Sequence, residues 1–174
     1  MTARPVEVLL LADTHLGPGQ GSRLVERLPR SLAAADVILH AGDIVDQSVL
    51  DELATFAPVH AVLGNNDHGV VLPERWVGSI GGCEVAMVHD SGPSAGRAGR
   101  LRRWFPSADV AVFGHSHIPW HETHVDDRGH LQHHVNPGSA TQRRRQPRCT
   151  VARMTLRGGQ VLDVRRVAVP GNEA

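Results

Sequence analysis

The chain has 174 residues, and its 18 basic residues, all of them arginine, balance 18 acidic residues, so that the net charge is zero with histidine neutral. The absence of lysine and tyrosine excludes a Schiff base, a P-loop lysine and a phenolic nucleophile. A net charge of zero argues against a general polyanion-binding protein, so nucleic acid is not an expected partner.

The length and the cysteines predict one domain in a reducing compartment. A single domain over residues 1–174, with a frayed tail at 170–174, follows from the usual domain size. Cys83 and Cys149 lie far apart and lack the CxxC spacing of zinc sites. The first apolar run ends at Asp13 without a cleavage site, and no stretch reaches the ~18–20 apolar residues of a membrane span. We therefore expect a cytoplasmic protein without a membrane partner.

The first part of the chain predicts alternating strands and helices. Continuous apolar runs indicate strands buried on both faces at residues 6–12, 36–40 and 58–63. Helical spacing of apolar residues predicts helices at 20–34 and 47–56. This order predicts parallel strands joined by right-handed crossovers.

The second part predicts hairpins and one further helix. We expect an arginine-rich helix at 96–105, and a core of Val, Leu, Ile and Ala because Phe and Trp are scarce. Antiparallel strands added to a parallel half predict an α/β fold, a two-sheet sandwich of mixed sheets flanked by helices in a single domain. The expected strands are 75–80, 83–89, 109–113, 120–125, 130–135, 148–156 and 160–169.

Five short polar motifs follow the ends of predicted strands. Ligands of open α/β sheets bind beyond the carboxyl ends of the strands, so we expect the motifs to meet at one edge of the sheet. The two-residue spacing within the first and last motifs predicts that each pair of side chains lies on one side of an extended segment. The motifs are Asp13-Thr14-His15, Gly42-Asp43, Gly64-Asn65-Asn66-Asp67, Val88-His89-Asp90 and Gly114-His115-Ser116-His117.

Each motif alone has a simpler interpretation. An aspartate after a strand often caps the next helix, and a single histidine is more often packed or solvated than a metal ligand. Five such motifs in order, each at a strand end, favour a metal site instead. Oxygen and imidazole ligands without thiolates suit manganese, iron, zinc or nickel.

The order D-x-H, GD, GN, H and GHxH resembles the calcineurin-like metallophosphoesterases, and the match extends from Val6 to about Val169. The GNND form at 64–67 and the sequence VNPGSA at 135–140 resemble the small bacterial and archaeal phosphodiesterase branch. The resemblance implies a two-sheet α/β sandwich with a dinuclear metal centre. It places one metal at Asp13, His15, Asp43 and His117, and the second at Asp43, Asn65, His89 and His115, with Asp43 as the bridge.

The same resemblance implies a metal-dependent phosphoesterase that cleaves a P–O bond by attack of a hydroxide bridging two divalent metals. Asp43 and Asn65 would be catalytic as ligands of this centre. We expect manganese first, with zinc, iron or nickel as alternatives, and a small phosphodiester rather than a monoester as the substrate.

The sequence departs from many relatives at the expected general acid. Relatives that read GNHE or GNHD have a histidine where this chain has Asn66, which cannot donate an acidic proton. We therefore expect slow hydrolysis and a preference for good leaving groups. Asp46 is expected to cap the helix at 47–56, and His68 to be a solvated turn residue rather than a replacement acid. Asn66 and Arg143 are the candidate substrate contacts.

Other functions stay open at this point. A retromer subunit with a resemblance to this family is a binding scaffold, and this chain could be a catalytically weak scaffold of the same kind. Phosphomonoesterase activity is a further alternative, and nucleic-acid binding has only the arginine clusters in its favour. The many histidines between 121 and 134 leave room for a surface between identical subunits.

Overall fold

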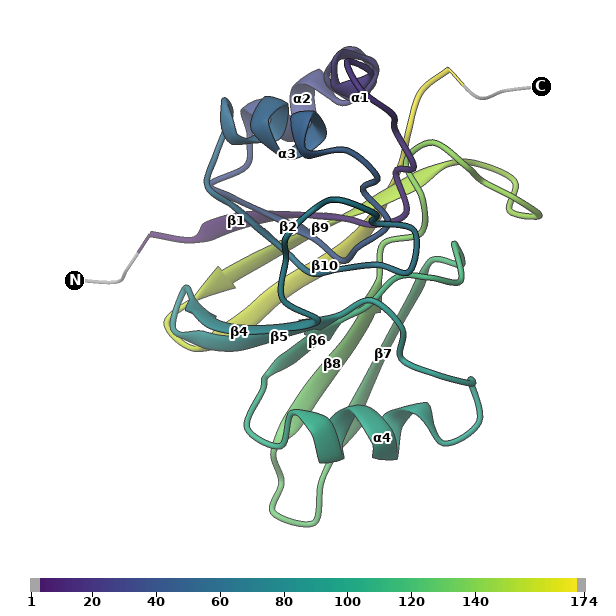
Figure 1. Cartoon of the computed structure of the whole chain (residues 1–174). Helices are drawn as coiled ribbons and strands as arrows, with labels where there is room; N and C mark the ends of the chain where they lie inside the picture. The colour runs from purple at the N-terminus through teal and green to yellow at the C-terminus, as the bar shows by residue number, and fades with distance from the viewer. Residues whose placement is uncertain (1–3, 172–174) are drawn as a thin grey trace.

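The computed structural model describes residues 4–171 as four layers, in the order helices, sheet, sheet and helix (Figure 1). The two sheets have the strand orders β10-β9-β1-β2-β3 and β4-β5-β6-β8-β7, which confirms the predicted two-sheet α/β sandwich. The elements are β1 (Val6–Leu11), α1 (Gly21–Arg27), α2 (Pro29–Ala33), β2 (Val37–His40), α3 (Gln47–Ala54), β3 (Val59–Ala61), β4 (Arg75–Ile80), β5 (Cys83–Val88), α4 (Arg97–Trp104), β6 (Val110–Val112), β7 (Trp120–Val125), β8 (Leu131–Asn136), β9 (Thr150–Arg157) and β10 (Gln160–Ala168).

The first sheet contains the predicted parallel strands. β1 pairs with β2 and β2 pairs with β3, both in parallel, as the alternation of strands and helices requires. β9 pairs antiparallel with β1, and β10 forms the edge beyond it. The helices α1, α2 and α3 cover the outer face of this sheet (Figure 1), where they pack on Leu9, Leu11 and Ile38.

The helical stretch predicted near 20–34 is confirmed, but it is divided into two short helices. The break falls at Leu28, whose φ of −123° and ψ of 31° lie outside the helical region. Pro29 has no N–H to continue the hydrogen-bond ladder, and its ring disfavours helical geometry at the residue before it. α3 begins as predicted, since the carboxylate of Asp46 accepts a hydrogen bond from the Ser48 backbone N–H at 3.0 Å.

The second sheet combines the predicted β4–β5 hairpin with strands from later in the chain. β5, β6 and β8 are parallel, and β7 is antiparallel to β8 at the edge. The four strands after Pro119 therefore divide between the sheets, with β7 and β8 in the second and β9 and β10 in the first. α4 covers the outer face of the second sheet (Figure 1).

The core between the sheets has the expected aliphatic composition, with Val8, Leu10 and Leu39 facing Val85 and Val110. Both cysteines are buried, and neither forms a disulfide within the described residues. No helix within residues 4–171 is long and apolar enough to cross a membrane. Most of the predicted frayed tail, residues 172–174, lies outside the described residues.

Candidate metal centre

The five polar motifs meet where strand ends of both sheets come together. Asp13 and Asp43 follow β1 and β2 of the first sheet, whereas His89 and His115 follow β5 and β6 of the second. The expectation of a single sheet edge is therefore wrong, because the strand order divides these motifs between two packed sheets. Backbone hydrogen bonds join loops within each sheet, from the Asp13 N–H to the Gly42 carbonyl at 2.9 Å and from the Gly114 N–H to the His89 carbonyl at 2.9 Å.

The backbone at five of the seven predicted ligands is left-handed rather than extended. Positive φ is uncommon outside glycine and persists where the surrounding structure determines it. The two-residue spacing thus brings both side chains of a motif to the site through a tight turn, and the expectation of an extended segment is wrong. The φ angles are 54° at Asp13, 46° at His15, 58° at Asp43, 68° at His115 and 59° at His117.

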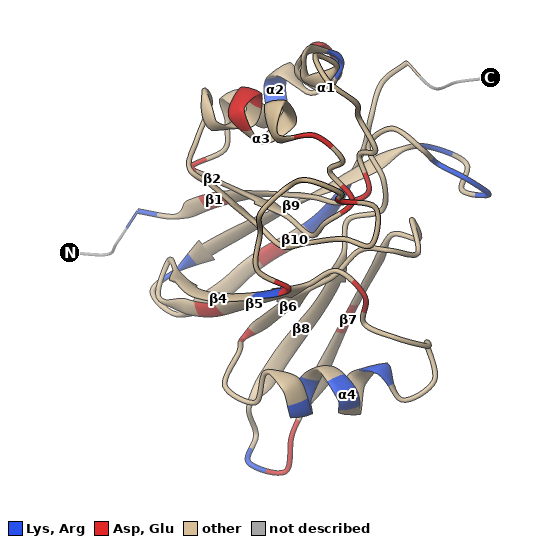
Figure 2. Cartoon of the chain, in the orientation of Figure 1, with Lys and Arg blue, Asp and Glu red and all other residues tan. Residues whose placement is uncertain are grey.

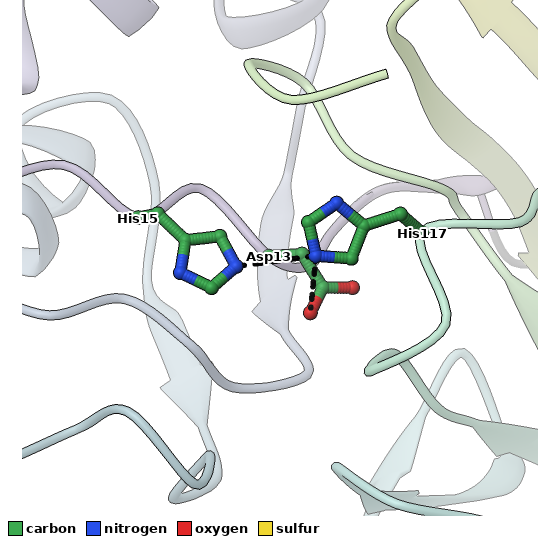
Figure 3. Close-up of side chains that lie close together, drawn as sticks. All are labelled: Asp13, His15 and His117. Atoms are coloured by element: carbon green, nitrogen blue, oxygen red, sulfur yellow. Dashed lines mark hydrogen bonds and ion pairs between the residues drawn. The ribbon is translucent and has the colours of Figure 1, made fainter. Parts of the chain in front are cut away.

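One group of side chains consists of Asp13, His15 and His117 (Figure 3). Nε2 of His15 lies 3.2 Å from Nε2 of His117, and the latter lies 3.6 Å from Oδ1 of Asp13. One ligand atom from each residue falls within 4.8 Å of the others. Two loops distant in sequence therefore supply one compact set of metal-binding atoms.

A second group surrounds Asn65. Its Oδ1 lies 3.0 Å from Nε2 of His89 and 3.0 Å from Nδ1 of His115. Asp43 lies between the two groups, with Oδ2 3.5 Å from Nε2 of His15 and Oδ1 3.5 Å from Nε2 of His89. All seven predicted ligands thus lie together, and their assignment to particular metals stays a prediction.

The hydrogen bonds of two histidines fix the ring nitrogen that faces the centre. Nδ1 of His89 lies 2.7 Å from the Ala41 carbonyl, and Nδ1 of His117 lies 2.8 Å from the Gln142 carbonyl. A carbonyl can only accept, so each Nδ1 carries a proton and each Nε2 is the ring nitrogen that faces the centre. Oδ2 of Asp13 is buried without a hydrogen-bond partner among the described residues. The carboxylate oxygens and histidine nitrogens that converge here are suitable ligands for divalent cations.

The pKa values of the centre are shifted in different directions. Burial and, less strongly, the nearby charge of Asp43 raise the pKa of Asp13 to about 7, while His89 opposes the shift. Burial alone would also raise the pKa of Asp43, but hydrogen bonds from His89 and Asn66 keep it well below its usual range. Burial lowers the pKa of His15 and His117, which favours the neutral imidazole that binds metals.

Asp67 is a site residue to which the sequence assigned no role. Its carboxylate accepts hydrogen bonds from the backbone N–H groups of Asp43 at 3.0 Å, Ile44 at 2.7 Å, Val45 at 2.6 Å and Gly64 at 2.7 Å. It thereby joins the loop after β2 to the loop after β3. A Cβ on Gly64 would lie 2.1 Å from the Asp43 nitrogen, so this approach requires glycine.

The two candidate substrate contacts lie in different surroundings. The Asn66 side-chain amide donates to Oδ2 of Asp43 at 2.7 Å, and its backbone N–H donates to Oδ1 at 2.9 Å. The Arg143 guanidinium donates to the Gln146 carbonyl of its own loop at 3.0 Å. Asn66 is therefore inside the centre, whereas the substrate contact of Arg143 stays a prediction. His68 is exposed, as expected of a turn residue.

Comparison with known sequences gives one family. The family model of the calcineurin-like phosphoesterase superfamily domain matches residues 6–159. A protein of Methanothermobacter thermautotrophicus named probable metallophosphoesterase is 33% identical over 136 residues, which cover 76% of this chain and 76% of that protein. A Mycoplasma genitalium protein of the same description is 32% identical over 144 residues, covering 77% of each chain.

Comparison with solved structures gives the same fold. Vacuolar Protein Sorting 29 from Cryptosporidium parvum has a TM-score of 0.74 at 21% identity, with 95% of this chain and 100% of that chain covered. A structure described as a novel archaeal phosphodiesterase has a TM-score of 0.70 at 18% identity, with 94% and 100% covered. At these identities the likeness concerns the fold alone.

Proposed function

Since the chain belongs to the calcineurin-like phosphoesterase superfamily, we propose that it hydrolyses small phosphodiesters with two divalent metal ions. Family membership and the grouped ligands support metal-dependent phosphoester hydrolysis. The preference for diesters and the presence of two metals are the finer parts of the proposal. A cytoplasmic location belongs to it too, in keeping with Cys83 and Cys149, which form no disulfide within the described residues.

The position of Asp43 is the observation on which the proposal rests. Its two oxygens face different histidines, each at 3.5 Å, so that one carboxylate borders both ligand groups. A carboxylate suits this position because it has two acceptor oxygens and offsets a shared positive charge. One ion would be held by Asp13, His15, Asp43 and His117, and the other by Asp43, Asn65, His89 and His115.

The side chains of this centre have distinct tasks in such a reaction. When bound, two cations supply a deprotonated water near neutral pH and offset the negative charge of the phosphate. His89 and His117 keep their Nε2 atoms aimed at the centre through the Ala41 and Gln142 carbonyls. The amide of Asn66 donates to Asp43 at 2.7 Å, and we propose that its other N–H donates a hydrogen bond to a phosphate oxygen. We propose manganese, and zinc, iron or nickel suit the same donors.

Hydrolysis of two aryl esters tests this function. The metal-free protein, the same protein after addition of Mn²⁺, and a chelated control are compared on bis(p-nitrophenyl) phosphate and on p-nitrophenyl phosphate. The proposal predicts Mn²⁺-dependent release of p-nitrophenolate that is faster from the diester. A faster reaction with the monoester would make the protein a monoesterase. Metal binding without turnover of either ester would favour the alternative that the chain is a binding scaffold. Vacuolar Protein Sorting 29 has the same fold.

A further inference from the structure

The loop between β8 and β9 is fastened to the candidate metal centre. The Ser139 hydroxyl donates to the Asp13 carbonyl at 2.7 Å, and the Thr141 hydroxyl donates to the Thr14 carbonyl at 2.6 Å. The Gln142 carbonyl accepts the Nδ1 proton of His117 at 2.8 Å. The residues that follow Gln142 therefore start at the rim of the centre.

Three arginines follow directly and form a tight turn. The Gln146 N–H donates to the Arg143 carbonyl at 2.8 Å, which places Arg144 and Arg145 at the two central positions of a β-turn. The Arg143 guanidinium bends back to the Gln146 carbonyl at 3.0 Å. Arg144 has a φ of 49°, a left-handed conformation that a long side chain rarely adopts. Strain of this kind is concentrated at binding sites.

The chain position of Arg144 keeps it near the centre. Only Arg143 separates it from Gln142, whose carbonyl accepts the Nδ1 proton of His117 at 2.8 Å. Thr141, one residue earlier, is held by the Thr14 carbonyl at 2.6 Å. The turn that carries Arg144 therefore begins beside the loops that supply Asp13, His15 and His117.

No acidic side chain of the described residues is paired with Arg144. The loop from 137 to 149 contains no Asp or Glu, and in Figure 2 it projects at the right of the view with blue segments and no red ones. Arg100, by contrast, donates to the Ser91 carbonyl at 2.6 Å, and Arg102 pairs with Asp126 at 3.2 Å. The guanidinium of Arg144 is therefore available to an anion that arrives from solution.

We propose that Arg144 binds a second phosphate of the substrate, beside the one that is cleaved, so that the substrates are small phosphodiesters with an additional phosphate group. A guanidinium offers planar, paired donors that match phosphate oxygens. The metals would already offset the charge of the scissile phosphate, so that Arg144 could bind a different anionic group. This inference rests on the proposed function, because it assumes that the scissile phosphate binds at the metal centre.

A matched pair of substrates tests this assignment. Thymidine 5′-(p-nitrophenyl phosphate) and its 3′-phosphorylated form release the same p-nitrophenolate and differ only in the second phosphate. Arg144→Gln should raise the KM of the 3′-phosphorylated ester about tenfold, as expected for a charge-assisted hydrogen bond at a partly exposed site, and leave its kcat unchanged. The KM of the other ester should not change. Arg145→Gln, at the other central position of the turn, should alter neither.

Equilibrium binding gives a readout that does not need turnover. The full chain, reconstituted with Mn²⁺, is titrated with thymidine 3′,5′-bisphosphate and with thymidine 5′-phosphate in a calorimeter. Tighter binding of the bisphosphate, lost in Arg144→Gln and kept in Arg145→Gln, supports the proposal even if the protein hydrolyses neither ester. Unchanged bisphosphate binding by Arg144→Gln would overturn it. An equal loss for both nucleotides would also overturn it, because Arg144 would then contact the phosphate common to both.

Discussion

Asp67 illustrates how a residue that need not touch a metal can determine the geometry of a metal centre. Its carboxylate fixes the backbone of Asp43, Ile44 and Val45 and also that of Gly64. Val45 has a φ of 84°, a conformation that is an outlier for a β-branched residue. The hydrogen bond from its N–H to Asp67 is one of the contacts that hold it there.

The substitution Asp67→Asn tests this role. One acceptor oxygen becomes a donor that faces backbone N–H groups, so we expect a loss of about 1–3 kcal/mol in the free energy of unfolding. Misplacement of the Asp43 loop should also lower Mn²⁺ affinity by about 10–100-fold. Urea denaturation of the metal-free protein and Mn²⁺ titration measure the two effects. Asp51→Asn, on the exposed surface of α3, is the control. Unchanged Mn²⁺ affinity in Asp67→Asn would limit Asp67 to a structural role.

We expect Asn66 to determine how strongly the rate depends on the leaving group. Its amide has no acidic proton, so hydrolysis should slow steeply as the pKa of the leaving phenol rises. Asn66→His should flatten this dependence and accelerate esters with poor leaving groups, by up to about 10²–10⁴-fold. The measurement is a rate series over substituted aryl diesters, with Asn66→Ala as the control that keeps the steep dependence. A wild-type rate that does not vary with leaving-group pKa would refute the missing acid.

At the scale of elements, local sequence patterns predict most strands but not their partners. The apolar runs of β1 and β2 are visible in the sequence because both faces of each strand are buried. The allocation of β7 and β9 to different sheets is not visible, since it depends on contacts far apart in the chain. The break at Leu28 could have been predicted from Pro29 alone.

The candidate site also has features that the local sequence predicts and features that depend on tertiary contacts. The identity and order of residues such as Asp13, His15 and Asp43 are enough to single them out in the sequence. Their left-handed backbone is not predictable from residue type, because tertiary hydrogen bonds hold it. The preference for Arg144 over Arg143 as a substrate contact likewise depends on the turn, in which the Arg143 guanidinium donates to the Gln146 carbonyl.

A buried histidine contacts the glutamine that links the second sheet to the segment after α4. Nε2 of His134 in β8 lies 2.8 Å from Oε1 of Gln132, whose amide donates to the Phe105 and Ala108 carbonyls at 2.8 Å each. Burial lowers the pKa of His134 to about 4. Nearby His124 and Arg102 contribute to this lowering of the pKa, and Glu122 opposes it.

This histidine should make the fold sensitive to acid. Between pH 6.5 and about 4 the unfolded chain takes up a proton at His134 and the folded chain does not, so stability falls as the pH falls. From pH 7 to 5 this amounts to about 2 kcal/mol in the free energy of unfolding. Urea midpoints at both pH values should therefore fall less in His134→Gln than in the wild type. His68→Gln, at an exposed turn, should behave like the wild type. Equal acid sensitivity of His134→Gln and the wild type would contradict this account.

At the scale of the whole molecule, the centre depends on the packing of the two sheets. The first sheet supplies Asp13 and Asp43, and the second supplies His89 and His115. Cations held by both sets would bind the native chain and not the unfolded one, so they would stabilise the packed sheets by mass action. Asp43 is central to this arrangement because it borders ligands from both sheets.

The most direct test of a shared Asp43 is the metal content of the wild type and of Asp43→Asn. Both proteins are reconstituted with Mn²⁺, freed of unbound metal and analysed by mass spectrometry for manganese per chain, with diester hydrolysis measured on the same samples. The account predicts two manganese ions per wild-type chain, and weakened binding of both ions with no turnover in Asp43→Asn. Wild-type metal content and undiminished hydrolysis in Asp43→Asn would contradict it.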